Sequence, residues 1–197
     1  IWIMDSEGAG ITHVTTGEEN SNDPDFSCDG NRIIYTFRDQ IWLMNADGGN
    51  KTQLTTINDT PYGAGGAQWS PDCSRIAYIA DPFCSHLGGQ PPTRPAEYSS
   101  LWLMDSDGSN KEPVLCGGKP INTCNLPISW SFDGKAILFF DRDPTGIERI
   151  FKVNLEDCIG AIPMTPDSVN AADPSWNPNR EKFAFRCEMG DGFHRIC

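Results

Sequence analysis

The sequence has no long apolar run. Its longest apolar stretches are five or six residues, as in the segment that ends at Phe140. A helix that crosses a bilayer needs about 20 such residues. We therefore expect no insertion into a membrane.

Basic residues are also scarce. The 197 residues hold 15 Lys and Arg against 27 Asp and Glu, which gives a net charge of −12. Proteins that bind nucleic acids need clusters of basic side chains that displace counterions from the phosphates, so we expect no nucleic-acid partner. The acidic balance permits divalent cations or basic partners, although solubility alone is the simpler explanation.

Paired cysteine spacings of the zinc-binding type are missing. None of the eight cysteines lies in a C-x-x-C pair, so an even and high number of cysteines predicts disulfides. Disulfides are typical of extracellular, periplasmic or cell-surface proteins. Two N-x-[ST] triplets, which begin at Asn50 and Asn58, agree with that location and are candidate glycosylation sites.

Motifs of the common enzyme classes are missing as well. There is no G-x-S-x-G nucleophile elbow, no H-E-x-x-H, no P-loop and no dinucleotide fingerprint. His13, His86 and His194 have no partner at a spacing that implies a site. The acidic turn at residues 105–110 offers oxygen ligands of the kind that Ca²⁺ prefers, but a hairpin turn needs the same residue types. We predict no catalytic residue, no metal and no cofactor.

What the sequence does contain is a repeat. An apolar and aromatic segment begins at residues 1, 41, 101 and 150, and a turn follows each copy. A second block, rich in Pro and Asp, precedes another short apolar segment in each period; its aromatic residues are Phe26, Trp69, Trp130 and Trp176. Each period therefore predicts four short strands and no long helix. Repeated four-stranded units are typical of β-propeller blades, and we expect the tryptophans to pack between blades.

The repeat W-S-P-D-G / I-A-Y / I-W-L-M-D-x-D-G-x-N / Q-L-T resembles the WD40-like (PD40) repeat of TolB-type β-propellers. The best copy runs from Gln68 to Asn110, and the resemblance covers nearly the whole chain. It implies an all-β propeller. Propellers of this type serve as periplasmic interaction modules, as gating domains of serine peptidases and as lyase scaffolds. They usually have six blades, whereas this chain has material for about four.

We therefore expect one β-propeller domain over residues 1–197 with about four four-stranded blades. The chain opens with the third and fourth strands of a blade and closes with the first and second strands, at residues 174–187. One blade would then be a composite of both ends, formed within one molecule or between molecules. Joining between molecules would be head to tail and would build a filament. Residues 192–197 also resemble the start of a further strand, which would make the chain a piece of a longer propeller.

Cysteine spacing predicts two local disulfides. Seven residues separate Cys116 from Cys124, and nine separate Cys187 from Cys197, so both pairs can be bridged without long-range folding. The other pairings stay open. From the alternation of hairpin turns we place three cysteines on one face of the propeller and five on the other. The three are Cys28, Cys73 and Cys158.

We predict a non-catalytic extracytoplasmic propeller that binds a protein partner or assembles with itself. One alternative is a structural subunit of an extracellular filament, polymerised by strand sharing at the termini. A second is the propeller domain of a larger hydrolase or lyase, with active-site residues elsewhere or at the propeller axis. The loop at residues 81–100 contains four prolines and is either a binding element or a tolerated insertion.

Overall fold

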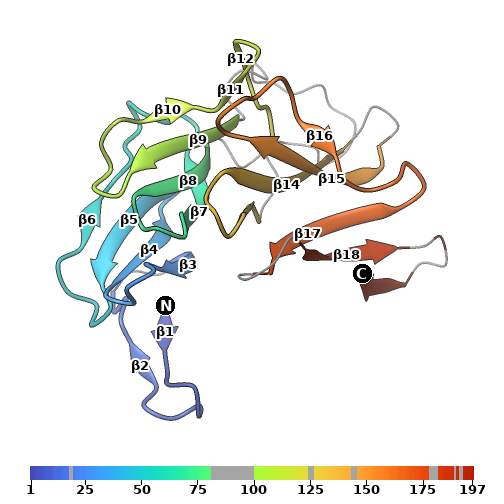
Figure 1. Cartoon of the computed structure of the whole chain (residues 1–197). Helices are drawn as coiled ribbons and strands as arrows, with labels where there is room; N and C mark the ends of the chain where they lie inside the picture. Colours follow the sequence, from blue (N-terminus) through green and yellow to red (C-terminus); the bar gives the residue numbers. More distant parts are fainter. Residues whose placement is uncertain are drawn as a thin grey trace.

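The computed structural model describes residues 1–17, 20–80, 100–123, 127–142, 146–177, 182–188, 190 and 193–197. All regular elements in these ranges are β-strands (Figure 1). No helix in the described ranges is long and apolar enough to cross a membrane.

Three four-stranded antiparallel sheets form the first three blades, and each keeps its strands in chain order. The first blade contains β3 (Asn22–Phe26), β4 (Arg32–Phe37), β5 (Gln40–Asn45) and β6 (Thr52–Gln53). The second contains β7 (Ala64–Trp69), β8 (Arg75–Ala80), β9 (Ser100–Asp105) and β10 (Glu112–Pro113). The third contains β13 (Ser129–Trp130), β14 (Ala136–Arg142), β15 (Glu148–Asn154) and β16 (Ile162–Pro163).

The last blade has three strands, and two hairpins accompany the blades. The last blade contains β17 (Asn170–Trp176), β18 (Phe183–Glu188) and β19 (His194–Ile196). The hairpins are β1 (Trp2–Ile3) with β2 (Thr12–His13), and β11 (Leu115–Cys116) with β12 (Lys119–Pro120). The four blades follow one another along an arc, with β3, β7 and β17 toward its inside and β6, β10 and β16 toward its outside (Figure 1). The predicted all-β class and four-blade propeller are confirmed.

The composition of the last blade differs from the prediction. The composite blade would place β1 beside β18, but β19 occupies that edge of β18, and β1 pairs with β2. The connection from β18 to β19 is short, so its closure costs much less conformational entropy than bringing the two ends of the chain together. A disulfide between Cys187 and Cys197 also holds this segment against β18.

Apolar packing joins each blade to the next. Trp69 of the second blade is buried in one cluster with Ile34 and Ile41 of the first. Trp130 of the third blade is buried in a cluster that includes Ile79 of the second. The expected position of the tryptophans between blades is therefore correct for both. The second strand of each complete blade is buried along most of its length. Neighbouring blades cover both faces of β8 and β14, whereas β4 packs against the second blade on one face and against Ile1, Ile3 and Val14 of the N-terminal segment on the other.

Aromatic side chains also pair within each complete blade. Tyr35 lies opposite Trp42, Tyr78 opposite Trp102, and Phe139 opposite Phe151. Cross-strand aromatic pairs of this kind stabilise a sheet by roughly 0.2–1 kcal/mol each. The apolar start of each repeat thus becomes the third strand of a blade, in register with the second.

A serine and an aspartate two residues later stabilise the turn between the first and second strands of each complete blade. Ser27, Ser70 and Ser131 donate their hydroxyls to Asp29, Asp72 and Asp133 at 2.5, 2.6 and 2.6 Å. The hydroxyl of Ser27 is the largest cause that lowers the pKa of Asp29, to about 2. The hydroxyl of Ser70 lowers the pKa of Asp72 to about 2 in the same way.

Replacing Ser70 by alanine is expected to raise the pKa of Asp72 toward its ordinary value. The hydroxyl of Ser70 is the largest cause of the lowered pKa. Because the folded state lowers this pKa, its contribution to stability is present above pH 4 and is lost as the pH falls through about 2. An NMR titration of the aspartate carboxyl carbons measures the shift. The pKa of Asp133 serves as an internal control, and a pKa of Asp72 that stayed near 2 would contradict the assignment.

Gly48 has a strict steric requirement. Its φ is +85°, and a Cβ atom there would lie 2.7 Å from the carbonyl oxygen of Val14. Gly48→Ala therefore adds a backbone clash to the strain of a left-handed conformation, and we expect it to destabilise the fold by more than about 1–2 kcal/mol.

The matched control for Gly48 is Gly8. It has a φ of +79° in the corresponding turn, and no atom would lie within 4 Å of an added Cβ. Gly8→Ala should cost only the backbone strain. Urea unfolding compares the two variants, and equal losses would show that the contact with Val14 is unimportant.

Candidate functional site

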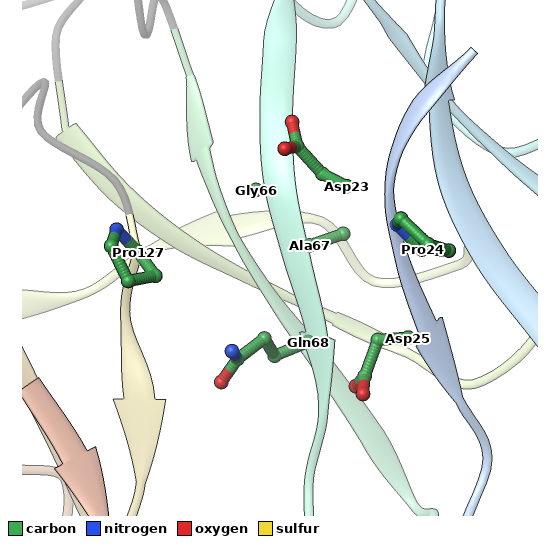
Figure 2. Close-up of a pocket in the computed structure, with 7 residues that line it drawn as sticks. All are labelled: Asp23, Pro24, Asp25, Gly66, Ala67, Gln68 and Pro127. Carbon is green, nitrogen blue, oxygen red and sulfur yellow. The ribbon is translucent and has the colours of Figure 1, made fainter. Parts of the chain in front are cut away.

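A pocket lies on the inner side of the arc, between the first strands of the blades. Its cavity volume is about 290 Å³. Asp23, Pro24 and Asp25 of β3 form one wall, Gly66, Ala67 and Gln68 of β7 form another, and Pro127 lies across from them (Figure 2). We call this the axial pocket. Because its walls are strands, its polar groups are held in fixed positions.

A β-bulge shapes the pocket walls. The pairing of β3 with β4, of β7 with β8 and of β17 with β18 is shifted at the same position of each strand. Asp23, Gly66 and Asp173 occupy these bulges at φ values of 50°, 60° and 54°. A left-handed conformation favours Gly, Asn and Asp. The backbone therefore selects the residue types that occupy this ring of positions.

Asp25 connects the first blade to the second. Its Oδ2 accepts a hydrogen bond from the backbone N–H of Trp69 at 2.8 Å. Burial raises the pKa of Asp25, and the N–H of Trp69 opposes that shift. Ser129 makes the equivalent contact between the third and fourth blades, where its hydroxyl oxygen accepts the N–H of Trp176 at 3.0 Å. Asp25 therefore joins two blades and also lines the axial pocket.

Asp23 lies nearer to solvent. It is exposed, and its Oδ2 accepts hydrogen bonds from Asn22 at 3.2 Å and from Thr36 at 3.4 Å. The described residues that line the pocket include two carboxylates and the amide of Gln68 but no lysine or arginine. Such a site can accept hydrogen bonds from an ammonium or guanidinium group.

The carboxylates of Asp23 and Asp25 are the ionisable groups among the described residues that line the axial pocket, and these residues include no histidine, cysteine, serine or threonine. Within the described ranges, no group of three or more His, Cys, Asp and Glu side chains is placed to hold a metal ion. His13 stacks on Trp2 at 4.3 Å between ring centroids, whereas His194 contacts Arg186 on the last blade, so the structure does not bring these histidines to one site. His86 lies outside the described residues.

The carboxylates of the acidic turn at residues 105–110 accept hydrogen bonds from other residues of the same turn. Asp107 accepts hydrogen bonds from the backbone and the hydroxyl of Ser109 at 2.9 and 2.6 Å. Asp105 accepts one from the side chain of Asn110 at 2.7 Å. These contacts are those of a hairpin turn.

The structure corrects one of the two predicted disulfides. Cys116 pairs with Cys158, so the predicted bridge from Cys116 to Cys124 is wrong. Tertiary folding brings the turn after β15 next to β11, and sequence spacing carried no sign of this contact. The pairing also contradicts the placement of Cys158 on the face opposite to Cys116. Cys84, Cys124 and the loop at residues 81–99 lie outside the described residues.

Two further disulfides are present. Cys187 pairs with Cys197, which is the pairing that their short spacing predicted. Cys28 pairs with Cys73 across the first two blades. The two sequon asparagines, Asn50 and Asn58, are exposed in turns.

The two aspartates of the axial pocket were not identified from the sequence. The signal was present in the second repeated block, where Asp23-Pro24-Asp25 stands at the position of Gly66-Ala67-Gln68. An unusual charge at the strand that lines a propeller axis could have pointed to this site.

Two curated proteins are similar to this chain in sequence. An uncharacterized protein, Atu1656, from Agrobacterium fabrum is 32% identical over 140 residues, which cover 68% of this chain and 44% of that protein. An uncharacterized peptidase, YuxL, from Bacillus subtilis is 36% identical over 81 residues, which cover 39% of this chain and 12% of that protein. This chain therefore spans less than half the length of either relative. No family model matches the chain.

Solved structures with the same fold include TolB proteins. TolB from Acinetobacter baumannii has a TM-score of 0.73 at 16% identity, over 99% of this chain and 44% of that chain. A protein from Agrobacterium tumefaciens described as a TolB has a TM-score of 0.66 at 18% identity, over 94% and 60%. An oligogalacturonate lyase from Vibrio parahaemolyticus has a TM-score of 0.58 at 18% identity, over 84% and 44%. By its fold, the chain is therefore a TolB-like β-propeller.

Proposed function

We propose that this chain is a non-catalytic interaction module that binds a protein partner through a basic group in the axial pocket. The observation that carries the proposal is the pair of carboxylates, Asp23 and Asp25, in a pocket with no basic residue among its described lining residues. A lysine or arginine side chain of a partner would complete this site by charge-assisted hydrogen bonds.

The charge of the whole chain favours the same class of partner. A net charge of −12 attracts a basic surface from a distance and accelerates association. The pocket then supplies the local contacts. Because burial raises the pKa of Asp25, this carboxylate is protonated at a higher pH than an unperturbed aspartate. On acidification, binding should therefore begin to weaken at that higher pH.

We place the protein in an extracellular or periplasmic compartment. The three disulfides among the described cysteines support this location, since such bonds persist in oxidising compartments. The exposure of Asn50 and Asn58 is compatible with glycosylation there. Peptide mapping by mass spectrometry of the secreted protein would detect a glycan at either residue.

The pocket is tested with a fluorescein-labelled peptide of alternating lysine and glycine. We expect Asp23→Asn together with Asp25→Asn to weaken its binding at least tenfold in an anisotropy titration. Asparagine keeps a side-chain oxygen that can accept the N–H of Trp69, and it tolerates the positive φ of Asp23. The change therefore removes charge with little effect on the fold.

The control removes the same charge elsewhere. Asp47 and Asp107 are exposed turn residues outside the axial pocket, and their conversion to asparagine should change the affinity less than twofold. Equal weakening by both double variants would mean that the peptide responds to overall charge, and the proposed pocket would then be wrong.

Self-assembly is the second candidate, because apolar side chains are exposed on the first hairpin and on the last blade. The side chains concerned are those of Trp2, Met4, Ile11, Phe193 and Ile196. Contact between these surfaces of different copies would give a head-to-tail assembly. Light scattering after size-exclusion chromatography separates the candidates. A species near 21.7 kDa would exclude assembly, and a much larger mass that survives dilution would favour it.

A further inference from the structure

The Cys28–Cys73 disulfide joins the two walls of the axial pocket. Cys28 lies in the turn directly after β3, and Cys73 lies in the turn after β7. Their Cα atoms are 5.6 Å apart. Just before these turns, within β3 and β7 themselves, the N–H of Trp69 bonds to Asp25. The disulfide therefore closes the seam between β3 and β7 just beyond the pocket.

β3 is the less firmly anchored of these two walls. Its side chains are exposed or half-buried along the whole strand, whereas those of β7 are mostly buried. Phe26 is 50% exposed, although Trp69 and Trp130 at the same position of the next blades are 6% exposed. β3, the wall that carries both carboxylates, therefore lacks the buried aromatic side chain that β7 and β13 have at this position.

Polar contacts also tie this end of the first blade to the second. Asp25 accepts the N–H of Trp69, and the guanidinium of Arg32, in the adjacent strand β4, lies 4.7 Å from the centre of the Trp69 ring. Polar contacts of this kind contribute about 1–2 kcal/mol or less each. A covalent bond at this position consequently has a large share in holding β3 in place.

The same disulfide is open to attack. Cys28 is exposed and Cys73 is half-buried. Each of the other two described disulfides has one buried residue, Cys116 in one and Cys187 in the other. Thiol–disulfide exchange requires access to a sulfur atom. Because Cys28 and Cys197 are exposed and neither Cys116 nor Cys158 is, a dithiol should reduce the Cys28–Cys73 bond, and also the Cys187–Cys197 bond, before Cys116–Cys158.

We infer that the Cys28–Cys73 disulfide is a redox latch on the axial pocket, an inference that rests on the proposed function of that pocket. A thiolate of an external dithiol attacks one sulfur and forms a mixed disulfide, and its second thiol then displaces the remaining cysteine. The dithiol becomes a disulfide, while Cys28 and Cys73 receive two electrons and two protons. Reduction frees β3 from β7, and the carboxylates of Asp23 and Asp25 lose their fixed position.

The latch is tested with dithiothreitol as the dithiol. Alkylation and mass spectrometry at increasing concentrations should label Cys28 and Cys73 before Cys116 and Cys158. Hydrogen exchange of residues 22–26 and of the Trp69 amide should then become at least tenfold faster, while β14 keeps its protection. Earlier reduction of Cys116–Cys158, or exchange of β3 that changes less than twofold, would overturn the inference.

A pair of variants separates the latch from a general loss of stability. Cys28→Ser with Cys73→Ser should show the fast exchange of β3 without any dithiol, and Cys187→Ser with Cys197→Ser should leave β3 protected. If the first variant does not fold, the alkylation order and exchange of the wild-type chain still decide. None of these measurements uses a partner, so failure of the latch is distinguishable from failure of peptide binding at the pocket.

Discussion

Replacement of Trp130 by alanine is expected to lower the free energy of unfolding by about 3–5 kcal/mol. Trp130 is 6% exposed and fills the interface between the second and third blades. Its indole N–H donates to the carbonyl oxygen of Gln68 at 3.2 Å, and the guanidinium of Arg75 lies 5.5 Å from its ring centre. The variant would leave a cavity and would remove the hydrogen bond to Gln68. Denaturant unfolding followed by circular dichroism measures the loss.

Two controls separate the contributions. Trp130→Phe keeps most of the apolar contact and loses the hydrogen bond to Gln68, so its loss should be smaller. Trp2 starts an equivalent strand but is 64% exposed, and Trp2→Ala should change stability by less than about 0.5 kcal/mol. Similar losses for Trp2→Ala and Trp130→Ala would contradict the assignment of Trp130 to an inter-blade core.

Removal of the Cys116–Cys158 disulfide should have an effect of the same size. The bond closes a loop of 42 residues, for which the chain-entropy model gives about 4 kcal/mol. It also fixes the β11–β12 hairpin, where the N–H of Gly117 bonds to the carbonyl oxygen of Cys158 at 3.1 Å. Cys116→Ala with Cys158→Ala should therefore unfold at a lower urea concentration, which equilibrium fluorescence measures.

The matched comparison is the Cys187–Cys197 bond. It spans only 10 residues, and the same model gives about 3 kcal/mol. Its removal should cost less than removal of Cys116–Cys158 and should mainly loosen β19. The reverse order of stabilities would show that local contacts, rather than loop length, determine what each disulfide contributes.

The strands and their order could be predicted because the sequence repeats the same local pattern. The segment that begins at Ile41 became β5, and the segment that begins at Leu101 became β9. In both, an aromatic residue meets an aromatic partner on the preceding strand. Local alternation and turn residues are sufficient to place such strands.

Contacts between distant segments could not be predicted in the same way. The partner of Cys116 depends on how the third blade packs against the β11–β12 hairpin, which no local pattern encodes. The last blade was expected to recruit β1, but β19 was available at a smaller entropic cost. Asp25 was missed for a similar reason, because its importance comes from meeting Trp69 of another blade.

The recurrent bulge also limits how such a molecule can diversify. Its residue has a left-handed backbone at Asp23, Gly66 and Asp173, and most side chains pay about 1–2 kcal/mol for that conformation. Mutation at this ring of positions therefore moves most easily among glycine, asparagine and aspartate, and seldom reaches lysine or arginine. Over evolutionary time, these inner positions can gain or lose negative charge far more readily than they can become positive, which biases descendants of this scaffold toward cationic ligands.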